Sequence, residues 1–105
     1  MSASVRNRLW IGNEWADAAS GASFESINPA TGEVITNVAE GDAADIDQAV
    51  AAAQAAMANP KWTGMNPHKR SHLMWKLADA IEANIDELAT LETQDNGKPF
   101  FESRY

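Results

Sequence analysis

Apolar and polar positions follow two different periods along the chain, and the period changes near residue 42. Residues 23–27 (SFESI) alternate apolar and polar side chains, which predicts a strand with one buried face. Residues 28–32 (NPATG) carry the Pro and Gly of a turn, and residues 33–39 (EVITNVA) form the next predicted strand. We therefore expect this region to fold as a β-hairpin.

A shorter pair of strands is predicted before this hairpin. Residues 9–11 (LWI) form its first strand, a Gly-Asn pair forms the turn, and residues 14–15 begin a return strand. Residues 17–22 are a predicted loop. Residues 1–8 are a polar lead without regular periodicity.

Three helices are predicted from residue 42 onwards, where apolar side chains recur every three or four residues. The first begins at Asp42, a favourable N-cap, and ends at about Ala58, before an Asn-Pro pair that stops a helix. Residues 61–65 are a predicted loop that contains Trp62. The apolar stripe of this first helix consists of Ile46, Val50, Ala53 and Met57.

The second and third helices each have a start signal in the sequence. Asn66 and Pro67 supply an N-cap followed by Pro in the first turn. The spacing from Asn84 to Glu87 predicts a capping box that opens the third helix. The predicted apolar positions are Leu73, Met74, Leu77, Ala78 and Ile81 in the second helix, and Ile85, Leu88 and Leu91 in the third.

The third helix also has a strong stop signal. Asn96 and Gly97 suit the left-handed residue that closes a helix, and Lys98 places positive charge at the negative end of the helix dipole. Pro99 then prevents continuation. Residues 100–105 are too short for a prediction.

The composition indicates that these elements build only a small core of their own. With 105 residues, the chain has room for one domain at most. Eighteen residues are Leu, Ile, Val or Phe. This share lies below roughly 20%, which together with a high net charge indicates a chain that does not build a full core alone. Twenty residues are Ala, which favours helix but buries little area. Four Trp residues argue against outright disorder, because they need a surface on which to pack.

Net charge and cysteine content exclude several classes of function. The formal net charge is −7, so phosphate backbones and anionic membranes repel this surface. No run of about 18 apolar residues predicts a transmembrane helix, and residues 1–8 lack the apolar region of a signal peptide. The absence of Cys excludes disulfides, thiolate metal sites and thiol nucleophiles within the chain. We expect a cytoplasmic protein that binds neither nucleic acid nor membrane.

Two groups of side chains have spacings that merit consideration as metal sites. His68 and His72 stand four residues apart on a predicted helix, a spacing that can chelate a metal, but no third ligand lies at a supporting spacing. Asp42, Asp45 and Asp47 lack the Gly and Glu that a calcium loop requires at its sixth and twelfth positions. Helix capping accounts for the Asp residues, and a polar surface accounts for the His residues.

Two further motifs resemble catalytic or phosphate-binding patterns only superficially. Gly97 and Lys98 resemble the end of a phosphate loop, but Pro99 stands where the loop needs Ser or Thr. Ser71 and His72 are neighbours on a helix and point about 100° apart, so they cannot form a nucleophile–base dyad. We therefore assign no catalytic, cofactor-binding or metal-ligating residue in this chain.

Several separated pieces of the sequence form an ordered set. They are LWIGNEW (9–15), INPATGEVI (27–35), AEG with DIDQAVAAA (39–41 and 45–53), Trp62, Arg70, LADAIE (77–82) and LETQDNGKP (91–99). Each piece alone is a weak signal, whereas the ordered set covers residues 9–104 and resembles the NAD(P)-dependent aldehyde dehydrogenases.

The resemblance implies an incomplete α/β fold: the N-terminal strands and three helices of a Rossmann-like cofactor-binding domain, over residues 9–105. Family members oxidise aldehydes to carboxylates with NAD or NADP. A Cys thiolate attacks the aldehyde, a hydride passes to the nicotinamide, and a Glu-activated water hydrolyses the thioester. In the family these residues and the cofactor contacts fall beyond Tyr105, so none is transferred to this chain. The resemblance further implies the remainder of the enzyme chain as partner, and a homodimer or homotetramer.

These observations predict that the chain is inactive and binds no cofactor alone. A small acidic helical interaction module, which docks on a partner through its helix stripes, is the alternative from another class. An acidic lid or inhibitor that competes for assembly of a full-length enzyme is a third possibility, without a sequence signal of its own.

Overall fold

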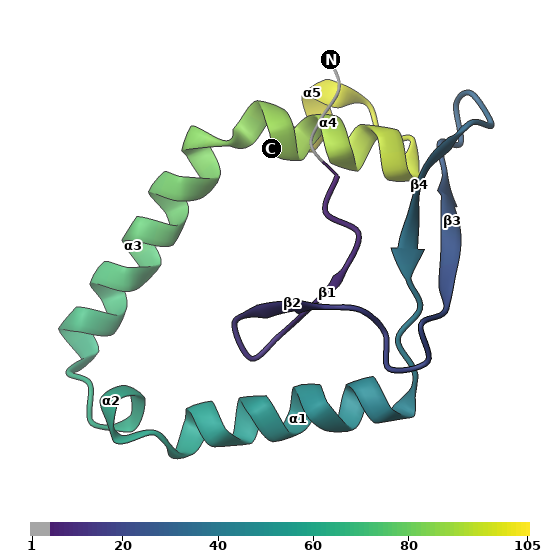
Figure 1. Ribbon diagram of the computed structural model, residues 1–105. Helices are drawn as coiled ribbons and strands as arrows, with labels where there is room; N and C mark the ends of the chain where they lie inside the picture. Colours follow the sequence, from purple (N-terminus) through teal and green to yellow (C-terminus); the bar gives the residue numbers. More distant parts are fainter. Residues whose placement is uncertain (1–4) are drawn as a thin grey trace.

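The computed structural model of the protein describes residues 5–105, in which two β-hairpins are followed by five helices (Figure 1). The helices α1, α3 and α4 and the second hairpin form an open frame, and the first hairpin lies inside the frame in this view. The strands are β1 (Leu9–Ile11), β2 (Glu14–Ala16), β3 (Ser23–Ile27) and β4 (Val34–Ala39). The helices are α1 (Ala43–Ala58), α2 (Pro60–Thr63), α3 (Pro67–Ala83), α4 (Ile85–Asn96) and α5 (Phe100–Ser103).

The first hairpin confirms the predicted short strands and turn. β1 and β2 pair antiparallel, with Trp10 opposite Trp15 and their ring centroids 4.9 Å apart. Gly12 and Asn13 both have positive φ, at 62° and 67°, the backbone that matches the right-handed twist of the two strands. The cross-strand Trp pair is the main side-chain contact of this ribbon.

The second hairpin confirms the pairing predicted from alternation. β3 and β4 pair antiparallel, with Ser23 opposite Ala39, and the register shifts at Ser26 and Ile27. The shift accommodates the turn, in which Gly32 has a φ of 76°. The two hairpins form separate two-stranded sheets, and an isolated sheet of two strands is marginally stable at best.

Helix α1 begins at the predicted cap and ends where predicted. The Asp42 side chain accepts hydrogen bonds from the Ala44 and Asp45 amides, at 2.9 and 3.4 Å, and the Asp45 carboxylate accepts one from the Asp42 amide at 2.9 Å. This capping box satisfies three backbone donors that the first turn leaves open. The helix ends at Ala58.

The loop predicted at residues 61–65 is wrong, because α2 forms a single helical turn at Pro60–Thr63. Asn59 Oδ1 accepts a hydrogen bond from the Lys61 amide at 2.9 Å, and Pro60 occupies the first helical position. The same Asn-Pro pair that stops α1 therefore also starts α2.

The capping box predicted at Asn84 is also wrong. No side-chain hydrogen bond caps the start of α4; instead Asn84 Nδ2 donates to the carbonyl of Ala80 at 2.8 Å. Asn84 thus closes the end of α3, and its backbone leaves the helical region, with φ −116° and ψ 17°. The junction between α3 and α4 is a one-residue bend, which leaves no separate cap for α4.

The described chain has almost no core. Its buried residues are few and small: Ala18, Asp45, Ala89 and Ser103. The accessible surface is 8064 Å², whereas a folded monomer of 11.3 kDa is expected to expose about 5,700 Å². The radius of gyration is 17.0 Å, against about 13 Å for a compact domain of this length. The chain is therefore an open arrangement that leaves most of its apolar surface uncovered.

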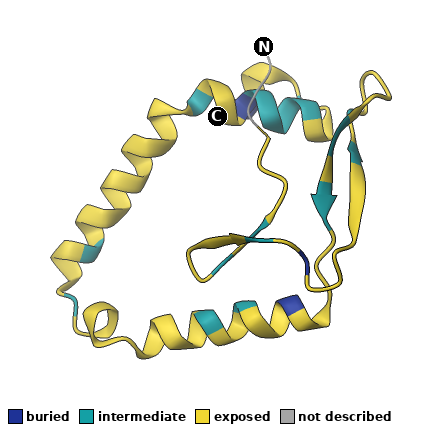
Figure 2. Cartoon of the chain, in the orientation of Figure 1, coloured by how far each residue is buried: buried dark blue, intermediate teal, exposed yellow. Residues whose placement is uncertain are grey.

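In the described residues 5–105 the predicted stripes of α1 and α3 are largely exposed, whereas Ile85 and Leu91 of the α4 stripe are half-buried. Figure 2 shows α3 exposed along nearly its whole length. The large side chains of the α3 stripe, Leu73, Met74, Leu77 and Ile81, are between 44% and 64% exposed. The α1 stripe is no better covered, since Ile46 is 62% exposed. No helix in the described part of the chain combines the length and apolar character that a membrane span requires.

Candidate functional site

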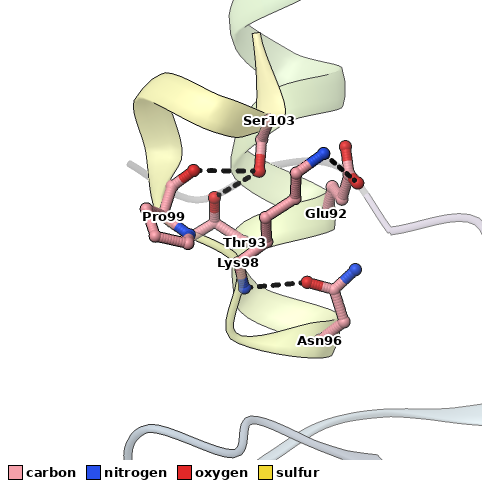
Figure 3. A network of polar contacts seen from close by, with 6 residues as sticks. All are labelled: Glu92, Thr93, Asn96, Lys98, Pro99 and Ser103. Carbon is pink, nitrogen blue, oxygen red and sulfur yellow. Dashed lines mark hydrogen bonds and ion pairs between the residues drawn. The ribbon is translucent and has the colours of Figure 1, made fainter. Parts of the chain in front are cut away.

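The end of α4 is the most densely connected polar region of the described chain (Figure 3). Gly97 adopts the predicted left-handed conformation, with φ 78°, and its amide donates to the carbonyl of Thr93 at 3.0 Å. The Lys98 amide donates to Asn96 Oδ1 at 2.8 Å. Lys98 Nζ lies 3.2 Å from Glu92 Oε1, so its charge is paired on the preceding turn.

Helix α5 folds back onto this end of α4 through two hydroxyl groups. Thr93 Oγ1 and Ser103 Oγ lie 3.0 Å apart, and Ser103 Oγ donates to the carbonyl of Pro99 at 3.4 Å (Figure 3). Ser103 is buried, so this contact is shielded from water. Residues 100–105, for which no element was predicted, thus include a helical turn held by contacts with α4.

The second hairpin reaches the same end of α4 from the other side. Ser26 Oγ donates to Asp95 Oδ1 at 2.8 Å, across 69 positions of sequence. A Cβ placed on Gly97 would lie 3.1 Å from Pro29 Cγ, so the hairpin turn packs closely against the glycine. The absence of a side chain at this position allows both the left-handed backbone and the close approach. The end of α4 is therefore a junction of α4, α5 and the hairpin.

A second polar contact ties the loop after the first hairpin to α1. The Asp45 carboxylate accepts hydrogen bonds from the Asp42 amide at 2.9 Å and from the Ala19 amide at 3.0 Å. Asp45 is only 4% exposed. The Asp42 amide, followed by the Ala19 amide, lowers the pKa of Asp45 from its ordinary value of 3.8, while burial opposes this change.

We expect the contact between Asp45 and Ala19 to loosen only in strong acid. Because the pKa is lowered in the folded chain, the contact stabilises the fold above the ordinary pKa and is lost as the pH falls through the lowered value. In an acid titration followed by NMR, the Ala19 and Asp42 amide signals should move with a midpoint below 3.8. A midpoint at or above that value would contradict the assignment. Asp45→Asn should abolish the movement, and Asp47→Asn should leave it unchanged.

Arg70 fixes α2 against α3. Its guanidinium lies 4.9 Å from the ring centroid of Trp62, and Nη2 donates to the carbonyls of Trp62 and Thr63, at 2.7 and 3.4 Å. These contacts satisfy carbonyls that the end of α2 leaves open. Arg70 Nε is buried without a hydrogen-bond partner among the described residues. Sequence reasoning identified Trp62 as a packing residue but offered no signal for this stacking.

The residues considered as metal ligands do not form a metal centre in the described chain. His68 and His72 line a shallow cavity of about 480 Å³ together with Met65, Lys69 and Leu73. Residues 5–105 contain no group of three or more His, Asp or Glu side chains placed to hold a metal ion. Asp42 and Asp45 are engaged in the capping box, whereas Asp47 is exposed.

The end of α4 also does not fit a dinucleotide phosphate. The amides of Gly97 and Lys98, which would have to face the phosphate, donate instead to Thr93 and Asn96. Lys98 Nζ is directed to Glu92. The end of α4 thus has a structural role and forms no phosphate-binding loop.

A groove of about 690 Å³ lies between the second hairpin and the corner formed by α3 and α4. Its apolar lining comes from the hairpin and both helices, and three carboxylates stand along it. The apolar residues include Ile35, Val38, Ile81, Leu88 and Leu91, and the carboxylates are Glu87, Glu92 and Asp95. It offers neither a nucleophile paired with a base nor a cluster of metal ligands.

Comparisons with known proteins identify the segment. The sequence model described as the aldehyde dehydrogenase family matches residues 15–105. The chain is 51% identical over 96 residues to the mitochondrial aldehyde dehydrogenase of Rattus norvegicus, which covers 90% of this chain and 18% of that protein. It is 48% identical over 98 residues to aldehyde dehydrogenase 1 of Tanacetum cinerariifolium, covering 93% of this chain and 20% of that one.

Solved structures agree with these relatives. The P. syringae indole-3-acetaldehyde dehydrogenase, a variant with one Cys replaced by Ala in complex with NAD+ and IAA, superposes with a TM-score of 0.92 at 40% identity. The match covers 96% of this chain and 20% of that chain. Betaine aldehyde dehydrogenase of Staphylococcus aureus in complex with NAD+ has a TM-score of 0.89 at 34% identity, over 94% and 20% of the two chains.

The chain therefore spans about a fifth of the length of the relatives that it matches. The match includes the hairpin strands and the helices whose order the sequence predicted, and the open α/β arrangement is a part of the larger fold. With the family model matched over residues 15–105, the chain belongs to the aldehyde dehydrogenase family.

Proposed function

We propose that this chain is the N-terminal part of an enzyme that oxidises aldehydes to carboxylic acids with a nicotinamide cofactor. The observation that carries the proposal is the match of residues 15–105 to the family model. Over 96 residues the chain is also 51% identical to a whole aldehyde dehydrogenase. Residues 9–105 are proposed to be the start of the cofactor-binding domain, preceded by the polar lead at residues 1–8. The solved relatives in complex with NAD+ favour NAD over NADP.

The contribution of these residues is structural. The sequence contains no Cys, so the chain has no thiolate that could attack an aldehyde, and the amides at the end of α4 are not free to bind a phosphate. The nicotinamide cofactor, bound to the complete enzyme, would accept the hydride. What this chain provides is a frame of helices and hairpins on which further elements of the domain can pack.

The proposed partner is the remainder of the enzyme chain. The accessible surface exceeds that of a compact monomer by about 2,300 Å², an excess comparable to obligate interfaces. The exposed stripes of α1 and α3 are the natural contact faces, because apolar side chains at helical spacing gain most from being covered. A homodimer or homotetramer of the whole enzyme stays a prediction. The cytoplasmic location also stays a prediction, and the named relatives include a mitochondrial enzyme.

A chimera tests this proposal. Residues 5–105 would replace the matching segment of the P. syringae indole-3-acetaldehyde dehydrogenase. The enzyme used would carry the Cys that is replaced by Ala in the solved variant. We expect aldehyde-dependent NADH formation within about tenfold of the parent enzyme, since the two segments superpose with a TM-score of 0.92. Failure of the chimera to fold or to turn over would count against the proposal.

A matched pair of substitutions in the chimera tests whether the apolar stripe of α3 is covered by the rest of the enzyme. Leu77→Asp places a carboxylate in the apolar stripe of α3, and burial of an unpaired charge costs several kcal/mol, so we expect little soluble active enzyme. Lys76→Ala, one position away on the polar side, should retain most of the activity. Equal activity of the two variants would show that the α3 stripe is not covered.

A further inference from the structure

The end of α4 combines its structural role with a reactive pair of residues. Asn96 is followed by Gly97, and it is the only one of the eight Asn residues in the sequence with Gly after it. In such a pair the backbone nitrogen of the glycine can attack the side-chain amide carbon of the asparagine, because glycine has no side chain to hinder the approach. Asn96 is exposed, so neither water nor the departing ammonia is obstructed.

The structure engages both reacting groups elsewhere. The Gly97 amide donates to the carbonyl of Thr93 at 3.0 Å, and its φ of 78° belongs to the left-handed helix cap. The Asn96 side-chain oxygen accepts a hydrogen bond from the Lys98 amide at 2.8 Å (Figure 3). An attack on the amide carbon requires both hydrogen bonds to break and the backbone to leave the cap.

Contacts from a distant part of the sequence hold this cap closed. Ser26 Oγ donates to Asp95 Oδ1 at 2.8 Å, and Pro29 packs against Gly97. Ser26 and Pro29 belong to the second hairpin. Opening of the cap is therefore coupled to the docking of the hairpin on α4.

We propose that Asn96 is a conditional deamidation site, which the helix cap and the docked hairpin keep unreactive and which reacts once the end of α4 opens. In the open state the Gly97 nitrogen loses its proton and forms a bond to Cγ of Asn96, and ammonia leaves with that proton. Water then opens the resulting succinimide to give aspartate or isoaspartate. No oxidant or reductant takes part.

Deamidation at position 96 permanently weakens the helix cap. Aspartate at position 96 adds negative charge at the negative end of the α4 dipole, beside Glu92 and Asp95. Isoaspartate also lengthens the backbone by one carbon between this residue and Gly97, so the amide of Gly97 no longer meets Thr93 in the same register. A chain that has reacted closes the cap less well than before.

Mass spectrometry of the chimera described above tests the proposal, because the end of α4 is there part of a whole domain. The chimera is incubated near neutral pH at 37 °C in native buffer and in the same buffer with concentrated urea, and conversion at Asn96 is followed by peptide mapping. We expect conversion in native buffer to be slower by about tenfold, which corresponds to about 1.4 kcal/mol for opening. Asn37, which precedes Val38, serves as the internal reference because its conversion should stay slow in both buffers.

Two variants connect the rate to the hairpin. Ser26→Ala removes the hydrogen bond to Asp95, and we expect its native rate to rise toward the rate in urea. Ser20→Ala is the matched control, since Ser20 Oγ contacts only the nearby Ala22 amide among the described hydrogen bonds. A native rate equal to that in urea, or a Ser26→Ala rate no higher than that of Ser20→Ala, would overturn the proposal.

Discussion

The purified 105-residue chain is expected to form no NADH or NADPH from any aldehyde. Oxidation by the proposed mechanism needs a thiolate nucleophile, and the sequence contains no Cys. The end of α4 also provides no phosphate cradle, since the Gly97 and Lys98 amides are bonded within the chain. The expected loss relative to a working enzyme is at least about 10⁶-fold, which places the rate at that of the uncatalysed reaction.

The measurement is the absorbance of the reduced nicotinamide, with a panel of aliphatic, aromatic and betaine-type aldehydes and both cofactors. The matched positive control is the chimera described above, assayed at the same concentration. A rate above background that purifies with the isolated chain would show that the chain carries chemistry of its own.

The second large effect is expected in thermal unfolding. A cooperative domain of about 100 residues unfolds with an enthalpy of about 60–80 kcal/mol, which reflects a packed core. No side chain of large volume is fully buried in the described chain, and the accessible surface is 8064 Å². We expect a broad transition in circular dichroism, with an apparent enthalpy well below that range, and binding of an apolar dye before heating.

Light scattering on the same sample separates a loosely packed monomer from an aggregate. In the chimera, the same segment should unfold within one sharp transition. A sharp, monodisperse melt of the isolated chain would instead favour a self-sufficient acidic interaction module. The exposed stripe of α3 would then be the first surface to test for a protein partner.

Local signals in the sequence predicted the elements whose causes are local. Asp42 was identified as the cap of α1 from residue type and position, and the structure confirms it with two hydrogen bonds. Gly97 was identified as the left-handed end of α4 from the Asn-Gly-Lys-Pro order, and its φ of 78° confirms this prediction. Alternation placed β3, and turn residues placed both hairpins, because each turn carries residues that its backbone demands.

The wrong predictions arose where one local signal had two meanings. Asn59 and Pro60 stop one helix and start the next, and only the start of α2 was missed. Asn84 has the residue type of an N-cap, but its side chain turns back to Ala80 and closes the preceding helix instead. The choice between these roles depends on the direction of the chain after the residue, which is set by tertiary contacts.

The contacts that join the elements could not be predicted from periodicity. The Ala19 amide meets Asp45 across 26 positions, and Ser26 meets Asp95 across 69. Such pairs need the relative placement of whole elements. The family resemblance was recognisable because its motifs are contiguous, and the match over residues 15–105 confirms it.

The nucleotide sequence that follows the Tyr105 codon is the most direct test of whether this chain is one part of a larger enzyme. We predict an open reading frame that continues for several times the present length and encodes a Cys-containing segment with aldehyde dehydrogenase similarity. An immediate stop codon, confirmed on the transcript, would contradict this and would leave a small protein that must act through the surfaces it exposes.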